Sequence, residues 1–293
     1  MKKILFITVA ILTLASCAKE PAFQNGPECN EMKFNISLAG HSDNNTKAIG
    51  TAFESGDAIS LYAVEYNGAA RMPLQIGGNF INNTNLTYGG SSWTSANKLY
   101  WSTNNCDFYA LYPYQQNITS IEDYPFSVAV NQDGDGYEAS DLLFAYAENV
   151  APQSIVNLQF NHMMSKCVVK IVKGENFEGE IPDDIVAHIY NTDVECTVDC
   201  ANGSVEKNSF GTKKTITMKK LPNEMFEAIL VPQNIEKRTP LIEITMGGIA
   251  YLLETSLSFR PGYVHTLTIT LNTSPDQEMI EINIDPSVNN WNN

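Results

Sequence analysis

Short apolar runs, separated by turn-forming residues, recur along almost the whole chain. Residues 32–38 alternate, with Phe34, Ile36 and Leu38 on one side and polar residues between them. A period of two is typical of a half-buried strand. Further runs rich in aromatic or β-branched residues predict more strands. These lie at residues 58–64, 99–101, 107–114, 126–130, 155–160, 167–172, 185–190, 216–218, 226–230, 241–246, 249–253, 263–271 and 279–284.

The pattern has little helical character. No segment keeps a 3.6-residue period over twelve residues, and residues 139–147 are the best candidate for a single short helix. Many short strands with Gly, Asn and Pro between them favour an all-β fold of sandwiches. Pro152 interrupts the pattern. We therefore expect an N-terminal β-sandwich domain over 32–152 and a C-terminal one over 153–293.

The start of the chain has the character of a bacterial secretory signal. Lys2 and Lys3 precede an apolar run over 4–14, which small residues and Cys17 follow. This order describes a signal peptide over 1–16, because a membrane span needs about 20 apolar residues. The sequence Leu-Ala-Ser-Cys resembles a lipobox, which implies lipid attachment at Cys17 and a tether over 17–31. A secretory signal with a chance Cys at its end is the alternative.

The net charge and the residue after Cys17 indicate which partners and which membrane to expect. The formal net charge is −15, and loss of the two signal lysines would make it −17. Such a surface repels phosphate backbones, so we expect no nucleic-acid partner. Anchoring must come from acyl chains, of which several hold a protein stably where one is marginal. Ala18, in place of the Asp that retains many enterobacterial lipoproteins at the inner membrane, favours the outer membrane.

Five cysteines remain after Cys17, and an odd number cannot all pair within one chain. In a strand, Cys196 and Cys200 would lie about 13 Å apart, too far for a disulfide. We expect the remaining cysteines to be small buried apolar residues. They are Cys29, Cys106, Cys167, Cys196 and Cys200.

The search for chemistry yields no catalytic or cofactor site. Residues 131–136 match the first half of a calcium-binding EF-hand loop, but its twelfth position is Leu142 instead of Glu. A tight acidic turn is the better interpretation, and weak calcium binding stays open. No histidine has a partner at metal-ligand or catalytic spacing, so we expect no enzyme, metal or cofactor. Four aromatic residues are candidates either for sugar stacking or for packing: Tyr88, Trp93, Trp101 and Tyr112.

Several segments, in this order, resemble the fimbrillin family of Bacteroidetes surface lipoproteins, which includes the Mfa-like subunits of type V pili. They are Thr46-Lys47-Ala48, Phe53 with residues 56–59, and residues 99–101, 107–113, 140–145, 160–166, 228–233 and 259–263. The resemblance implies two tandem transthyretin-like β-sandwich domains. It also implies a lipoprotein precursor that a protease trims, and polymerisation by exchange of a strand between subunits.

Two segments are candidates for that exchange. Ile280, Ile282 and Ile284 alternate with polar residues, as a donor strand should, although an ordinary last strand would look the same. The resemblance makes residues 32–38 a temporary plug, removed by cleavage after a basic residue. Lys47 is the candidate processing site, yet the family usually has Arg there, which an Arg-specific protease requires. An uncleaved tip, an anchor or a role outside a pilus therefore stays open.

The sequence thus predicts a structural protein, a surface-anchored subunit of a type V pilus that contributes to adhesion. Its partners would be other pilus subunits or further copies of itself, and the outer membrane through the lipid. The alternative is a monomeric outer-membrane lipoprotein of the same fold that binds host or bacterial surface glycans or proteins.

Overall fold

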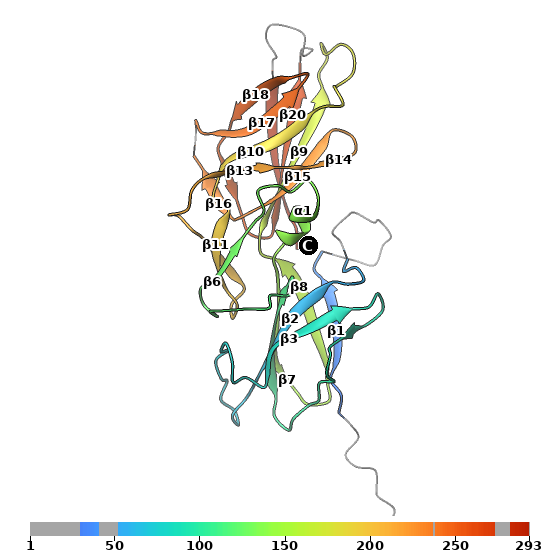
Figure 1. Ribbon diagram of the computed structural model, residues 1–293, viewed down its shortest axis with the longest axis vertical. Coiled ribbons are helices and arrows are strands. Elements are labelled where there is room, and N and C mark those ends of the chain that lie inside the picture. Colours follow the sequence, from blue (N-terminus) through green and yellow to red (C-terminus); the bar gives the residue numbers. More distant parts are fainter. Residues whose placement is uncertain (1–29, 41–51, 237, 273–281, 293) are drawn as a thin grey trace, which may run out of the picture. The chain divides into compact units, whose positions relative to one another are not determined.

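The computed structural model describes residues 30–40, 52–236, 238–272 and 282–292. The chain divides into two compact units, Met1–Asn30 and Glu31–Asn293, and all elements below belong to the second (Figure 1). The candidate sites Cys17, Lys47 and Ile280 lie outside the described residues. Within the described residues, no helix has the length and apolar character needed to cross a membrane.

The prediction of an all-β fold is confirmed: one short helix accompanies twenty-one strands among the described residues. The elements are β1 Lys33–Leu38, β2 Ala58–Glu65, β3 Ile81–Tyr88, β4 Trp93–Thr94, β5 Cys106–Tyr112, β6 Tyr124–Ser127, α1 Asp135–Ala139, β7 Leu143–Val150, β8 Ile155–His162, β9 Ser165–Lys173, β10 Val186–Thr192, β11 Glu195–Asp199, β12 Ser204–Lys207, β13 Lys214–Thr217, β14 Lys219–Leu221, β15 Met225–Leu230, β16 Gln233–Ile235, β17 Pro240–Met246, β18 Ile249–Glu254, β19 Leu257–Phe259, β20 Tyr263–Leu271 and β21 Ile282–Asn290.

The first large sheet has seven strands in the order β1-β8-β7-β5-β2-β3-β4. Its central strands are buried on both faces, which explains why their sequences are almost continuously apolar. Ile59 and Leu61 of β2 belong to one hydrophobic cluster, whereas Tyr62 and Val64 belong to another. By contrast, β8 alternates between buried and exposed positions. Its buried residues Val156, Leu158 and Phe160 belong to the same cluster as Ile59.

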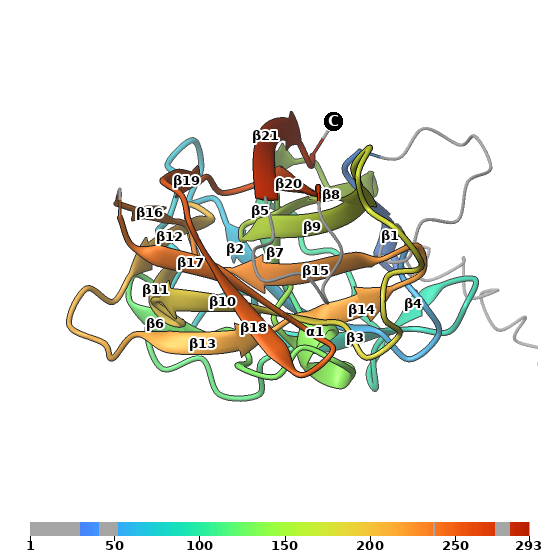
Figure 2. The same cartoon turned by 90° about the horizontal axis from the view of Figure 1, so that it is seen from above.

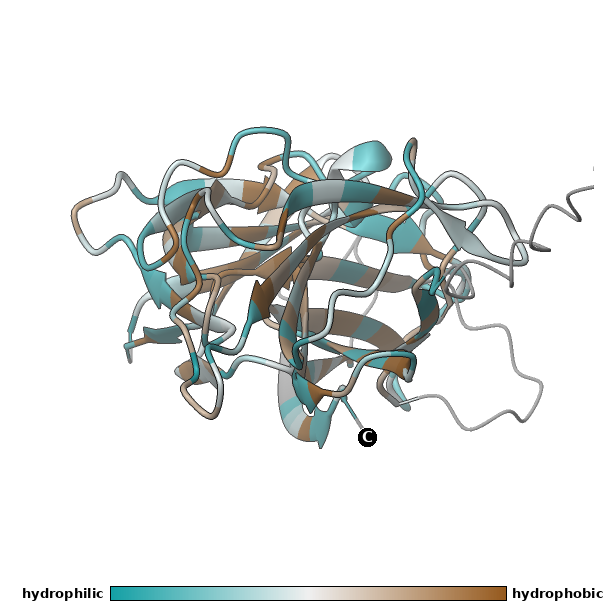
Figure 3. Ribbon diagram, turned by 90° about the horizontal axis from the view of Figure 1, so that it is seen from below, coloured by the Kyte–Doolittle hydropathy of each residue, from teal (hydrophilic) through white to brown (hydrophobic). Residues whose placement is uncertain are grey.

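The remaining strands form a five-stranded sheet, β14-β15-β9-β20-β21, a four-stranded sheet, β13-β10-β17-β18, and two smaller sheets. Buried residues of β9 and β20 share one hydrophobic cluster with those of β10 and β17. Figure 2 shows these strands from above, and Figure 3, seen from below, shows apolar residues along strands in the interior of the molecule. This is the packing of two sheets over a common core.

The predicted helix over 139–147 is wrong. The helix is α1, which ends at Ala139, and β7 covers Leu143–Val150. In β7, Leu143 and Ala145 are buried in the core cluster that contains Ile59, and the strand pairs with β5. Burial between strands distant in sequence outweighs a weak local helix preference.

The predicted domain boundary, between residues 152 and 153, falls between β7 and β8. These strands are neighbours in the seven-stranded sheet, where Leu143 pairs with His162. In addition, β6 pairs with β11 from the second half of the chain. The division into domains over 32–152 and 153–293, and their likeness to transthyretin, therefore stay predictions.

Candidate functional site

The first strand, β1, lies along the edge of β8. The two strands are parallel, in a register that runs from Lys33 opposite Ile155 to Leu38 opposite Phe160. Just beyond the strand, the Ala39 N–H donates to the Phe160 carbonyl at 2.8 Å. Within β1, the backbone therefore pairs with one neighbouring strand only.

The side chains of β1 cover part of the core. Leu38 and the preceding Met32 are buried, and Phe34 and Ile36 are half-buried against the same cluster. The Phe34 ring lies edge-on to Phe108, with 6.3 Å between the centroids. Departure of β1 would expose this apolar surface together with the unpaired backbone edge of β8.

The last strand, β21, forms the edge of the five-stranded sheet. It runs antiparallel to β20, with Ile282 opposite Leu271 and Ile284 opposite Ile269. Of the three candidate donor residues, these two thus lie on a strand that pairs with its own chain. From Asp285 to Asn290 every side chain is exposed. Over this part, hydrogen bonds to β20 hold the strand, with little apolar burial.

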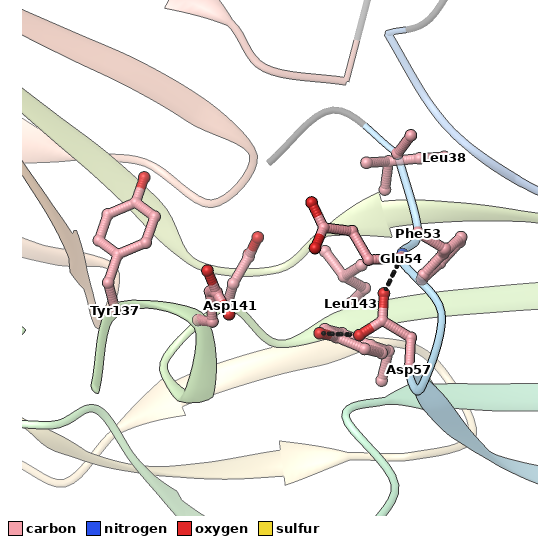
Figure 4. Close-up of a pocket in the computed structure, with 10 residues that line it drawn as sticks. Leu38, Phe53, Glu54, Asp57, Tyr137, Asp141 and Leu143 are labelled. Carbon is pink, nitrogen blue, oxygen red and sulfur yellow. Dashed lines mark hydrogen bonds between the residues drawn. The ribbon is translucent and has the colours of Figure 1, made fainter. Parts of the chain in front are cut away.

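A small cavity of about 90 Å³ lies where β1 ends (Figure 4). Leu38 and Ala52, the neighbours of the segment that contains Lys47, both line it. Asp57 accepts hydrogen bonds from the Glu54 N–H at 2.7 Å and from the Tyr112 hydroxyl at 3.1 Å. Burial, then the charge of Asp57, raises the pKa of Tyr112. The cavity is smaller than ligand pockets of about 300–1,000 Å³.

A wider hollow of about 500 Å³ lies beside Arg71, with Met72, Tyr109 and Asn202 in its lining. The Arg71 guanidinium is fixed there, because Nε donates to Asp107 at 2.7 Å and Nη2 donates to the Tyr109 hydroxyl at 3.1 Å. The hollow has the size of a small-molecule site.

The four aromatic candidates for sugar stacking pack against other rings. Trp93 lies between Phe53 and Tyr88, with centroid separations of 5.0 and 5.1 Å. Trp101 lies 5.6 Å from Phe108, and Tyr112 lies 5.6 Å from Phe53. These contacts favour the packing interpretation for all four.

The acidic turn at 131–136 precedes and overlaps α1. The Asp133 N–H donates to Asn131 Oδ1 at 3.1 Å, and Asp133 and Asp135 are exposed. Within the described part of the chain, no group of three or more His, Cys, Asp or Glu residues could hold a metal ion.

Four of the remaining cysteines are unpaired and buried, as predicted. Burial raises the pKa of each thiol to about 12, so the reactive thiolate form is scarce. They are Cys106, Cys167, Cys196 and Cys200. Cys29 lies outside the described residues.

Sequence reasoning missed the contacts of the chain end. Trp291 and Asn292 pack on His162, the last residue of β8. His162 is also buried, and its Nδ1 lies 2.8 Å from Asp141 Oδ1. No local pattern could have indicated this pairing, because it joins residues 130 positions apart.

Comparisons with known proteins place these features in context. The model of a family described as fimbrillin-like matches residues 46–291. A second model, of a prokaryotic membrane lipoprotein lipid attachment site, matches residues 1–18 and so includes Cys17.

Individual relatives agree with this match. A protein of Bacteroides ovatus, provisionally named as fimbrium tip subunit Fim1C, is 28% identical over an alignment of 198 residues that covers 58% of this chain. The match spans only 36% of that relative's length. Two crystal structures of proteins provisionally assigned to cell adhesion share the fold. One from Bacteroides ovatus has a TM-score of 0.70 at 18% identity and covers 89% of this chain and 97% of its own. One from Bacteroides uniformis has a TM-score of 0.63 at 23% identity, covering 82% and 93%.

Proposed function

Because this chain belongs to the fimbrillin-like family, we propose that it is a lipid-anchored subunit of a type V pilus, assembled by strand exchange, that contributes to adhesion. Its anchor is acyl chains on Cys17, and its location is the cell surface at the outer membrane. The matched lipid attachment site over 1–18 supports the anchor.

The position of β1 carries the proposal. The strand covers an apolar cluster, yet in the register with β8 it pairs through one edge only. The chain between Leu38 and Ala52 contains Lys47, so cleavage after Lys47 would break the covalent connection between β1 and β2. The groove left behind would offer unpaired backbone and apolar pockets, which an extended strand can fill.

The last strand is the proposed donor. It lies at the edge of a sheet and exposes its side chains from Asp285 to Asn290, so removal of this part uncovers little apolar surface. Ile280, Ile282 and Ile284 would supply the alternating apolar side chains that enter the groove of a second copy.

Proteolysis followed by sizing tests this function. A chain that starts at residue 18 would be treated with a lysine-specific protease, and its termini and mass distribution measured. We expect cleavage after Lys47 and concentration-dependent oligomers. Lys47→Gln should keep β1 joined to β2 and stay monomeric, and a chain that ends at residue 277 should be cleaved after Lys47 but not polymerise. A wild-type chain that is cleaved, loses β1 and still remains monomeric would refute strand exchange.

The hollow beside Arg71 favours a second candidate, a monomeric lipoprotein that binds surface glycans or proteins. The fixed guanidinium and Asn202 would supply polar contacts, and Met72 an apolar one. Binding of the uncleaved monomer on a glycan array, abolished by Asn202→Ala and Arg71→Ala, would support this candidate. If the protein bound nothing on the array, glycan binding by this candidate would be excluded.

A further inference from the structure

Trp291 and Asn292, which follow β21, contact His162 of the first large sheet. The Trp291 indole stacks on the His162 imidazole, with 3.6 Å between centroids and 8° between planes. The Asn292 side chain binds the His162 backbone twice. Its Oδ1 accepts from the His162 N–H at 2.7 Å, and its Nδ2 donates to the His162 carbonyl at 3.3 Å. Trp291 thus contacts the ring of His162, and Asn292 binds its backbone.

The surface that receives Trp291 is held in place by other parts of the fold. His162 is fixed through Nδ1 by Asp141 at 2.8 Å. Lys166 Nζ lies 5.4 Å from the centre of the indole ring, and Glu227 holds that ammonium at 2.6 Å. The receiving groups therefore have partners of their own, apart from the chain end.

Gly262 gives the chain end room to approach. Its carbonyl accepts from the Trp291 N–H at 2.8 Å. A Cβ at Gly262 would lie 2.4 Å from Asn292 Nδ2, which no side chain tolerates without movement. A side chain at this position would therefore displace the Asn292 amide from its place on His162.

The strand that leads to this contact is weakly held elsewhere. Every side chain from Asp285 to Asn290 is exposed. Pro286, opposite Leu267, has no N–H to donate to the ladder. Over residues 285–292, the half-buried side chains are therefore Trp291 and Asn292.

We propose that Trp291 and Asn292 form a clamp on His162 that holds β21 on its own sheet, and that this clamp must open before β21 can pair with a second copy of the chain. The first half stands on the contacts of the single chain. The second half rests on the proposed strand exchange.

Hydrogen exchange of the uncleaved monomer tests the clamp. The protein is the chain from residue 18, as wild type, Trp291→Ala and Asn292→Ala. Asn289→Ala is the matched control, because this asparagine is exposed on the same strand. We expect the β21 amides to exchange about tenfold faster in both clamp variants, with amides of β5 and β9 unchanged, because local opening does not require global unfolding. The control should match the wild type.

Two results would overturn the proposal. Unchanged exchange of β21 in both clamp variants would show that the backbone ladder suffices. Faster exchange throughout β5, β9 and β21 would show that these residues stabilise the whole fold instead of one strand.

A peptide of residues 282–293 tests whether Trp291 keeps the edge of β20 covered. Labelled peptide is mixed with wild-type or Trp291→Ala chain, and binding is followed by fluorescence anisotropy. We expect association about tenfold faster with the variant, because the edge of β20 is more often uncovered. A peptide that carries Trp291→Ala should dissociate faster than the unchanged one. Equal association with both chains would refute the part of the proposal in which Trp291 holds β21 on β20.

These measurements use monomers and do not require a polymer. If the clamp variants behave as expected but the cleaved wild type never oligomerises, the clamp stands and strand exchange fails. Suppose instead that the cleaved chain polymerises while neither substitution changes the hydrogen exchange of the β21 amides. In that case strand exchange between copies is supported and the clamp is refuted.

Discussion

Arg71 Nε donates a hydrogen bond to Asp107 Oδ2 at 2.7 Å, although the Asp107 side chain is only 1% exposed and that of Arg71 is 50% exposed. The same carboxylate accepts from the Tyr146 hydroxyl at 3.1 Å and from the Asn149 N–H at 2.8 Å. One buried charge therefore joins the start of β5, the end of β7 and the segment after β2.

Asp107→Ala should destabilise the fold by about 3 kcal/mol, because it leaves buried donors without an acceptor. Arg71→Gln should cost less, since Asp107 keeps two of its three donors. Urea unfolding of both variants measures the difference. A loss for Asp107→Ala no larger than that for Arg71→Gln would contradict this account.

A glycine pair separates steric clash from backbone strain. Gly203 and Gly68 have nearly equal positive φ, +64° and +63°. A Cβ at Gly203 would lie 2.1 Å from Phe144 Cδ1, whereas one at Gly68 would meet nothing within 4 Å. Gly68→Ala should therefore cost about 1 kcal/mol, the price of an Ala at positive φ, and Gly203→Ala about 2–4 kcal/mol because of overpacking.

The double variant identifies the clash. In a Phe144→Ala background, the cost of Gly203→Ala should fall toward that of Gly68→Ala, because the obstructing ring is gone. Thermal or urea unfolding of the four chains gives the coupling energy. Strict additivity of the two substitutions would show that Phe144 is not the obstacle.

His265 should make stability depend on pH. Burial, followed by the charge of Arg260, lowers the pKa of His265 from 6.5 to about 4, and its Nε2 accepts from the Arg260 N–H at 3.0 Å. Between pH 4 and 6.5 the unfolded chain binds a proton that the folded chain does not. The free energy of unfolding should therefore fall as pH drops through this window, by up to about 3 kcal/mol from this residue.

His265→Gln should remove this part of the pH dependence while keeping an acceptor for Arg260. Unfolding in urea at several pH values compares the two chains. Their stabilities should run parallel above pH 7 and converge as the pH falls from 6.5 to 4. Parallel curves down to pH 4 would contradict the lowered pKa.

The buried thiols should be chemically inert in the folded protein. In a chain from residue 18 with Cys29→Ala, a thiol reagent at pH 8 should modify none of the four cysteines until urea unfolds the chain, because burial keeps them protonated and covered. Absorbance of the released chromophore counts the thiols. Rapid modification of Cys106 before unfolding would show that its strand opens locally.

The positions of strands such as β1 and β8 could be predicted because side-chain alternation is local, whereas β3, β11 and β12 were not among the predicted runs. The period of two in β1 and β8 follows from which side chains face the core, and each strand shows it by itself. At residues 139–147 the same approach failed, because the pairing of β7 with β5 is not visible in the segment. The lipid attachment segment and the fimbrillin-like family could also be recognised from the sequence. Both depend on residues that are near in sequence or that follow in a fixed order.

The sequence by itself thus determined the all-β class, the lipid attachment segment and the family. Only the tertiary structure decided which faces of β2 and β5 meet which core, because that depends on the sheets that pack on either side. It also decided that Trp291 meets His162, and that Arg71 and Asp107 share a buried contact. Such contacts join residues far apart in the chain, and only the order and register of the strands bring them together.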